Sequence, residues 1–392
     1  MLSLNAILGL SFLMAVFGSI LLSLLICVQD FFKTRFSLPK LYYRDCTLTS
    51  HLLKKCRLRE RLFCPPFWLS NSHVQTILSA ILPSADVTFD REYLQMRDKG
   101  VIALDWVVSV QPIIKKKRTI LLIIPAITSD AVSASALCHL AAQRGFKSVV
   151  FNRRGHGGSV LTTPKLQSSG DPVDLRQAVK YIRLKFPKFK LAAVAYGTGC
   201  GLLISYLGEF GSSSLISVGA CVSPCYEASE RFSNSMHSIY DYLFLFKLKT
   251  VLCSHATALS QVVDLNKALQ AWNFHTYEEL VYCKMYGFES MEEFWERNNP
   301  IRDVDDISVP VLCINSLDDP FYAESGIPYD IFKYYPNFLL VATDRGGHCG
   351  FVENLSSQSW ADKLSLDYID AVFEFTTKGY TVNNRGKVRS TI

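Results

Sequence analysis

Short β-rich runs alternate with helical patterns along most of this 392-residue chain. The first run, residues 119–124, is apolar without interruption and ends at Pro125, which is typical of a strand buried on both faces of a parallel sheet. Further runs of this kind lie at residues 148–152, 191–195, 216–222, 311–314 and 338–343. Helical patterns lie near residues 134–143, 172–185, 200–207 and 360–375. The alternation predicts an α/β fold with a mostly parallel, doubly wound sheet.

Two segments of the chain interrupt this alternation. Residues 85–108 predict a hairpin, because two β-rich runs flank a turn at Asp98-Lys99-Gly100. Residues from about 225 to 300 are rich in aromatic side chains and leucine at helical spacing, which indicates a helical cap inserted over the sheet. We therefore expect a folded domain over residues 62–377, followed by a polar, basic and disordered tail over residues 378–392.

A long apolar segment precedes this domain. No charged residue lies between Ala6 and Val28, and a helix over these residues is long enough to cross a hydrocarbon layer of about 30 Å. The segment accounts for almost all of the positive mean hydropathy of the chain, +0.16. Residues 1–32 are therefore predicted to form a single-pass transmembrane anchor. The alternative is a cleaved signal peptide, which would make the protein secreted, although such peptides have a shorter apolar region and a basic start.

A basic collar follows the apolar segment. Residues 33–61 contain nine Lys or Arg side chains and two acidic ones, so their net charge of +7 exceeds the +6 of the whole chain. We interpret them as a juxtamembrane linker, and the positive-inside rule then places the domain on the cytoplasmic side. The collar either attracts anionic membrane lipid or is a solvated charged face, and we expect no nucleic-acid partner. The glycosylation sequon at Asn354 would matter only if the domain were lumenal.

The cysteine pattern argues against disulfide and metal sites. The 12 cysteines are scattered from Cys27 to Cys349 without a CxxC pair, which is typical of small buried residues in a reducing compartment. The loop from Arg153 to Gly158 is rich in glycine and basic residues, but it lacks the spacing of a Walker phosphate loop. We therefore predict no metal and no cofactor.

Two candidate catalytic side chains follow neighbouring strands. Asp318 and Asp319 come after the run at 311–314, and Asp319, directly before a proline, is the better placed to orient a histidine. His348 lies 29 residues later, in a glycine-rich loop after the next run. An acid after one strand and a histidine after the next are the last two members of a hydrolase triad in the order Ser, Asp, His. A purely structural His–Asp pair is the alternative.

The nucleophile of such a triad lies on a sharp strand-to-helix turn, G-x-S-x-G. Residues 195–199, Ala-Tyr-Gly-Thr-Gly, predict this turn, but the nucleophile position holds Gly197, which has no side chain. Thr198 is a candidate surrogate nucleophile, because His348 could activate its hydroxyl, yet one step along the turn re-aims the side chain. Cys200 is interpreted as a packing residue of the following helix.

An oxyanion hole would complete this site. Its predicted donors are the backbone amides of Ile127, in the loop after the first strand, and of Thr198. The same loop, residues 125–130, is equally well explained as an ordinary connection in which Ser129 or Asp130 caps the next helix.

Six motifs occur in the order that one protein family has: His73-Val-Gln-Thr-Ile77, Leu104-Asp105-Trp106, Asn152-Arg-Arg-Gly155, Ser205-Tyr-Leu-Gly208, Asp318-Asp319-Pro320 and Gly346-Gly347-His348. Through them the chain resembles the membrane-anchored alpha/beta-hydrolase domain-containing family, the AB hydrolase 4 group, from about residue 62 to 375. The resemblance implies an alpha/beta-hydrolase fold with a helical cap and lipid esterase activity on phospholipids or acylglycerols. It places the catalytic acid at Asp319, the histidine at His348 and the missing serine at Gly197.

The resemblance and the missing serine together predict a catalytically impaired pseudo-hydrolase of lipid metabolism with a regulatory or scaffolding role. Membrane lipid, a lipid or acyl ligand in the pocket and a protein partner are the expected partners. The alternative is an active lipid or carboxyl-ester hydrolase that uses Thr198 with His348 and Asp319.

Overall fold

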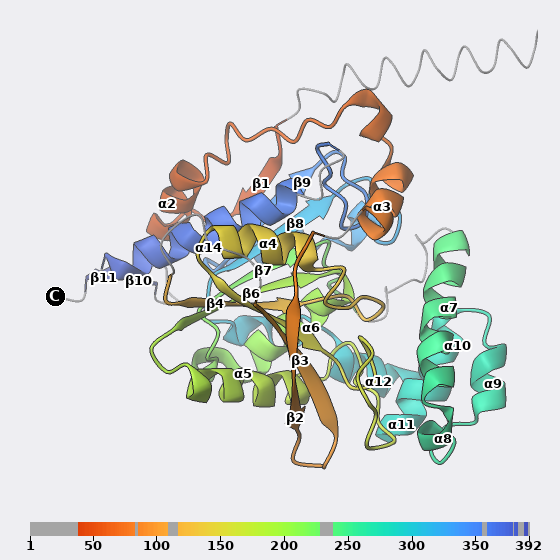
Figure 1. Ribbon diagram of the computed structural model, residues 1–392. Helices are drawn as coiled ribbons and strands as arrows, with labels where there is room; N and C mark the ends of the chain where they lie inside the picture. Colours follow the sequence, from red (N-terminus) through yellow and green to blue (C-terminus); the bar gives the residue numbers. More distant parts are fainter. Residues whose placement is uncertain are drawn as a thin grey trace, which may run out of the picture.

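One sheet of nine strands organises the residues that the computed structural model describes: 38–82, 85–108, 117–227, 238–354, 359–378, 380–382 and 388–390. The strand order is β1-β9-β8-β7-β6-β4-β5-β3-β2 (Figure 1). The strands are β1 (Lys40–Tyr43), β2 (Phe89–Gln95), β3 (Val101–Val107), β4 (Thr119–Ile124), β5 (Lys147–Asn152), β6 (Lys190–Tyr196), β7 (Val218–Val222), β8 (Val311–Ser316) and β9 (Phe338–Thr343). The strands from β9 to β5 run parallel, as predicted, and β1, β2 and β3 pair antiparallel.

The parallel strands are buried on both faces, which explains their uninterrupted apolar sequences. In β4, Leu121 and Ile123 belong to the core on one face, while Leu122 and Ile124 belong to the core on the other. Helices cover both faces of the sheet, and all of them except α2 match a predicted helical pattern. On one side lie α2 (Thr47–Lys55), α4 (Ser135–Gln143) and α14 (Trp360–Thr377), and on the other lie α5 (Val173–Lys185) and α6 (Thr198–Phe210) (Figure 1).

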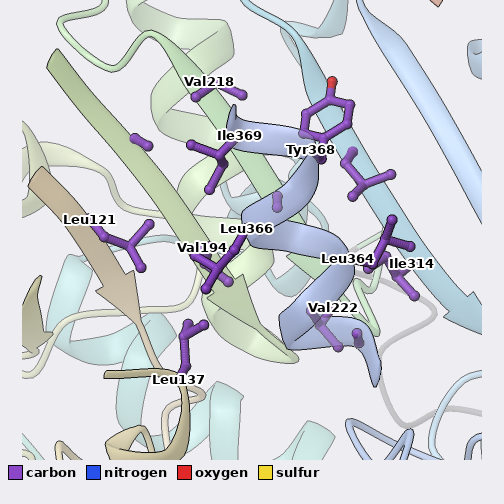
Figure 2. Close-up of a cluster of buried hydrophobic side chains, with 14 of the residues drawn as sticks. Leu121, Leu137, Val194, Val218, Val222, Ile314, Leu364, Leu366, Tyr368 and Ile369 are labelled. Carbon is purple, nitrogen blue, oxygen red and sulfur yellow. The ribbon is translucent and has the colours of Figure 1, made fainter. Parts of the chain in front are cut away.

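Figure 2 shows the core on the α14 side of the sheet. Leu364, Leu366 and Ile369 of α14 lie among buried side chains of several parallel strands, such as Val194 and Ile314. Outside the cap, the other helical segments are α3 (Ser72–Ile81), α13 (Tyr329–Tyr334) and the turns η1 (Phe67–Leu69), η2 (Gly211–Ser213), η4 (Val304–Asp306) and η5 (Glu324–Gly326).

A helical insertion follows β7, where the cap is predicted. Its described elements are α7 (Ser238–Ser254), α8 (Ala256–Leu259), α9 (Leu265–Gln270), α10 (Phe274–Glu278), the π-helical turn η3 (Glu279–Cys283), α11 (Lys284–Tyr286) and α12 (Met291–Asn298). Tyr240 of α7 packs on Phe321 after β8, with ring centroids 5.1 Å apart, and His255 Nε2 lies 2.8 Å from the carbonyl oxygen of Gly155 after β5. The insertion therefore contacts loops at the carboxyl ends of the strands, where sheets of this type form their sites.

The basic segment 33–61 is not a linker from Lys40 onward. β1 pairs with β9, and α2 buries Leu48 and Leu52 in the core that α14 covers. Carboxylates of α14 neutralise part of the positive charge of this segment, because Lys55 pairs with Glu374 at 2.9 Å and Arg61 with Asp367 at 2.5 Å. The linker prediction is wrong for these residues, since the net charge of a segment does not show which carboxylates the fold brings to it.

The structure tests the prediction for the C-terminal end of the chain but not the one for the N-terminal end. The tail 378–392, predicted to be disordered, contains β10 (Tyr380–Val382) and β11 (Val388–Ser390), which pair antiparallel. The prediction is wrong there because the β-branched residues of both strands outweigh the polar, basic composition of the segment. The predicted anchor lies outside the described residues. Among the helices that the structure does describe, none has the length and apolar character to span a membrane.

Candidate active site

A sharp turn joins β6 to α6 at Gly197. Its backbone has φ 48° and ψ −120°, in the left-handed region that favours glycine. The Gly197 N–H donates to the carbonyl oxygen of Val222 in β7 at 3.0 Å. At Gly199 a Cβ atom would lie only 2.3 Å from the carbonyl oxygen of Ile124, so a glycine is needed where α6 meets the end of β4. The turn thus has the backbone of a nucleophile elbow but no nucleophilic side chain.

The structure brings His348 and Asp319 together at this turn. His348 Nδ1 lies 2.9 Å from Asp319 Oδ2, and the other carboxylate oxygen accepts hydrogen bonds from the amides of Phe321 at 2.8 Å and Tyr322 at 3.3 Å. Phe321 also stacks on the imidazole, with ring centroids 4.3 Å apart. Burial of the ring lowers the pKa of His348, but the Asp319 carboxylate and the neighbouring Cys349 thiol outweigh it and raise this pKa well above its usual value.

The imidazole faces the position that lacks a side chain. A Cβ atom at Gly197 would lie 3.1 Å from His348 Nε2 and 3.5 Å from the Cβ of Ala126. Nε2 is the nitrogen that accepts the proton of a nucleophile in a hydrolase triad. Gly197, His348 and Asp319 therefore have the relative placement of a triad whose first member is missing.

The histidine loop is held by residues outside the predicted site. The amide of His348 donates to Thr76 Oγ1 of α3 at 2.9 Å, and the amide of Gly347 donates to Asp318 Oδ1 at 2.9 Å. Burial raises the pKa of Asp318, which also accepts a hydrogen bond from Ser316. The adjacent carboxylates thus have different partners, since Asp318 binds the loop backbone and Asp319 binds the imidazole.

Thr198 contacts the predicted oxyanion loop and not the histidine. Its Oγ1 accepts a hydrogen bond from the backbone amide of Ile127 at 2.8 Å, and its side chain is buried. Within the described residues, no hydrogen bond joins Thr198 to His348. The amide that the sequence predicts as an oxyanion donor is therefore already occupied by the candidate surrogate nucleophile.

The loop after β4 does not cap the next helix through Ser129 or Asp130. The N-cap residue of α4 is Ala134, which has no side-chain cap. Asp130 instead binds Ser133, whose amide donates to Asp130 Oδ1 at 3.0 Å. The capping interpretation is wrong because a turn at residues 131–134 separates this loop from the helix. Cys200 is fully buried in α6 with its Sγ 3.4 Å from the carbonyl oxygen of Val222, which fits its interpretation as a packing residue.

The arginine-rich loop after β5 serves the fold. Arg153 is buried and donates to the carbonyl oxygens of Ser168 and Thr198 at 3.1 and 3.3 Å. Arg154 is buried between the carboxylates of Asp174 and Asp98. Both guanidinium groups thus have protein partners. Within the described residues, no group of three or more His, Cys, Asp or Glu side chains is arranged to hold a metal ion.

A buried carboxylate lies behind the elbow. Asp362 of α14 accepts a hydrogen bond from the hydroxyl of Tyr196, the residue before Gly197. Burial raises the pKa of Asp362 to about 6, although the Tyr196 hydrogen bond and Lys363 oppose this shift. Sequence reasoning misses this pair, because the two residues are 166 positions apart and only the fold brings them together.

We expect Asp362→Asn to change how stability depends on pH. A carboxylic acid with a raised native pKa binds its proton more tightly in the folded state, so the free energy of unfolding falls as pH rises from about 4 to about 6. Relative to Asp362→Asn, the wild type should lose about 2–3 kcal/mol between pH 4 and pH 7. Urea unfolding at several pH values measures this difference. The exposed control Asp90→Asn keeps Asp362, so its free energy of unfolding should fall with pH as that of the wild type does. The same fall in Asp362→Asn would contradict the assignment.

Sequence comparisons agree with this geometry. The family model described as alpha/beta hydrolase fold matches residues 119–355. The chain is 38% identical over 346 residues to Protein ABHD15 of Homo sapiens, covering 85% of this chain and 74% of that protein. It is 27% identical over 350 residues to Phospholipase ABHD3 of Mus musculus, covering 86% and 85%. It is 26% identical over 367 residues to Monoacylglycerol lipase ABHD2 of Mus musculus, covering 86% of each.

Proposed function

This chain belongs to the alpha/beta-hydrolase domain-containing family, and we propose that it is a catalytically impaired member that acts in lipid metabolism by binding and not by hydrolysis. One observation carries the proposal: the elbow holds Gly197, and the hydroxyl of Thr198 occupies the Ile127 amide. The site thus lacks its nucleophile and has one predicted oxyanion donor engaged within the protein.

The expected loss of activity is large. Removal of the nucleophile from a serine hydrolase costs on the order of 10⁶ in turnover and leaves about 10³–10⁴ over water through the oxyanion hole and binding. An occupied donor removes part of that remainder, since one oxyanion donor contributes about 10²–10³. Ester turnover by this chain should therefore be close to the uncatalysed rate.

We propose an acyl lipid as the ligand of the retained site. Two relatives are named as a phospholipase and a monoacylglycerol lipase, which supports a lipid ligand for this site. The apolar run from Ala6 to Val28 anchors the chain in a membrane, and the basic residues beside it keep the domain on the cytoplasmic side. For such a lipid site without turnover we propose a regulatory or scaffolding role, exerted through a protein partner.

The alternative, a hydrolase that uses Thr198, requires the hydroxyl of Thr198 to reach His348. That hydroxyl instead accepts a hydrogen bond from the backbone amide of Ile127, so it is directed toward the loop after β4. A misplacement of about 1 Å can cost about 10² in rate, so this geometry opposes the alternative.

Turnover and ligand content test the proposal. The full chain, purified in detergent, is assayed with a monoacylglycerol and a phospholipid beside His348→Ala and Thr198→Ala. We expect the three rates to be equal, because none depends on a triad, and we expect native mass spectrometry to find a bound acyl lipid. Turnover that falls in both variants would contradict the loss of catalysis, and a chain without bound lipid would contradict the ligand.

A further inference from the structure

Helix α3 carries its polar and apolar residues on unexpected faces. Gln75 and Thr76 are buried beneath it, whereas Ile77 and Ile81 are 51% and 67% exposed and Val74 is exposed beside them. These apolar positions are spaced i, i+3 and i+7, so they share one side of the helix. A helix of a globular protein usually turns such a stripe toward the core. Here the stripe is turned outward.

The buried polar face of α3 explains this orientation. Gln75 donates to the carbonyl oxygen of Val352 at 3.0 Å and accepts a hydrogen bond from the Val352 amide at 2.7 Å, while Thr76 accepts from the His348 amide at 2.9 Å. The helix thus uses its polar side chains to hold the segment that carries the imidazole. Its apolar side chains remain available for contact outside the protein.

The turn before α3 also exposes an apolar side chain. Trp68 of η1 is 46% exposed, and no Lys, Arg, Asp or Glu occurs between Arg61 and Asp86. An uncharged segment with exposed tryptophan and isoleucine matches the chemistry of the lipid interface, where aromatic rings meet headgroups and aliphatic side chains reach the acyl chains. We call Trp68, Val74, Ile77 and Ile81 the α3 face.

The α3 face lies near the point where the chain arrives from its apolar segment. Lys40 Nζ, at the start of β1, lies 3.4 Å from Asp344, and the next residue, Arg345, donates to the carbonyl oxygen of Ser70 at 3.1 Å. Figure 1 shows α3 beside the loop that follows β9. Ten residues separate Val28 from Leu38 and span at most about 35 Å, so a membrane around residues 6–28 lies within reach of this edge.

We propose that the α3 face docks into the lipid interface of the membrane that holds residues 6–28. The inference rests on the anchor in the proposed function and goes beyond the loss of catalysis. Docking places the histidine loop, through Thr76 and Gln75, directly behind the membrane-facing helix. The cap contacts the same helix, because His73 Nδ1 of α3 lies 2.9 Å from the hydroxyl of Tyr240 in α7. Docking through the α3 face therefore brings the His348 loop close to the bilayer.

Tryptophan quenching by lipid tests the docking. The chain has five tryptophans, of which Trp68 and Trp272 are exposed, and residues 1–37 contain none. The full chain is reconstituted in phosphatidylcholine–phosphatidylserine vesicles with or without brominated acyl chains, and flotation confirms its attachment. We expect brominated lipid to quench the wild type and Trp68→Phe to lose most of that quenching. The matched control Trp272→Phe, which alters an 88% exposed ring on the cap, should keep it.

A charge on the α3 face provides a second measurement. Ile77→Lys should reduce the quenching of Trp68, whereas Leu184→Lys, the same kind of change on an exposed position of α5, should not. If the chain floats with the vesicles but Trp68→Phe leaves the quenching unchanged, the docking is wrong and the anchor stands. The α3 face is then exposed to water or covered by residues 6–28 or by a second copy of the chain. If the chain does not float, the anchor and the docking fail together, and the loss of catalysis is unaffected.

Discussion

Gly197→Ser should make this chain an esterase, with a gain in turnover of up to about 10⁶ over the wild type. A Cβ atom at this position lies 3.1 Å from His348 Nε2, so a hydroxyl on it meets the base of an assembled His–Asp pair. A complete triad contributes about 10⁶, and the engaged Ile127 amide does not change this ratio, because both chains have it. The assay is hydrolysis of a soluble ester by the full chain, with His348→Ala in the same background as the control that removes the gain.

Thr198→Ala combined with Gly197→Ser should raise turnover by a further factor of about 10²–10³. Removal of the Thr198 hydroxyl frees the Ile127 amide to bind the oxyanion of the tetrahedral intermediate. Thr198→Ser is the matched control, because it keeps a hydroxyl that can accept the same hydrogen bond. If the alanine and serine variants have equal turnover, Thr198 does not block the oxyanion hole.

The gain in activity has a cost in stability. Gly197 has a positive φ, and a side chain in this region costs about 1–2 kcal/mol. The 3.1 Å contact also requires His348 to shift by a few tenths of an ångström. Thermal unfolding of Gly197→Ser should therefore show a modest loss, so that an inactive but folded variant can be told from an unfolded one.

Arg154→Leu should remove about 3–5 kcal/mol from the free energy of unfolding. The guanidinium of Arg154 binds Asp174 through Nε and Nη2 at 2.5 and 2.6 Å and Asp98 through Nη1 at 2.6 Å, and its side chain is only 4% exposed. Without it, the buried Asp174 carboxylate has no cation to compensate its desolvation. Urea unfolding of the full chain in detergent measures the loss.

Two controls distinguish a buried ion pair from ordinary packing. Lys333→Leu removes an exposed partner of Asp330 and should cost less than about 1 kcal/mol. Burial already raises the pKa of Asp174, and loss of Arg154 raises it further, so the cost of Arg154→Leu should be smaller at pH 5 than at pH 8. A loss that does not vary with pH would mean that Arg154 acts through packing and not through its charge.

The parallel sheet and the His–Asp pair could be predicted from the sequence because both depend on local patterns. Each buried strand has an apolar run of its own, and the convergence of strand ends places Asp319 and His348 at one edge without knowledge of the loops. The elbow could be predicted from the small residues of one five-residue segment, residues 195–199. Gly197 could be recognised as the empty nucleophile position for the same reason.

Features that depend on distant contacts could not be predicted. The hydrogen bond between Ile127 and Thr198 joins residues 71 positions apart, and nothing in either segment shows that the hydroxyl occupies the amide. From the sequence, the basic residues of α2 are expected to be solvated, but the fold pairs Lys55 with Glu374 of α14. The orientation of helix α3 could not be predicted either, because its apolar spacing indicates a helix whose apolar side faces the core. Only the contacts of Gln75 show that the polar side is buried.

The absence of a working nucleophile is tested most directly by the mass of the intact protein. The wild-type chain is incubated with a fluorophosphonate, which bonds covalently to an activated hydroxyl, and its mass is measured beside that of Gly197→Ser. We expect the wild type to keep its mass and Gly197→Ser to gain one adduct that His348→Ala abolishes. An adduct on the wild type that disappears in both Thr198→Ala and His348→Ala would contradict the account, because Thr198 would then be a functional nucleophile.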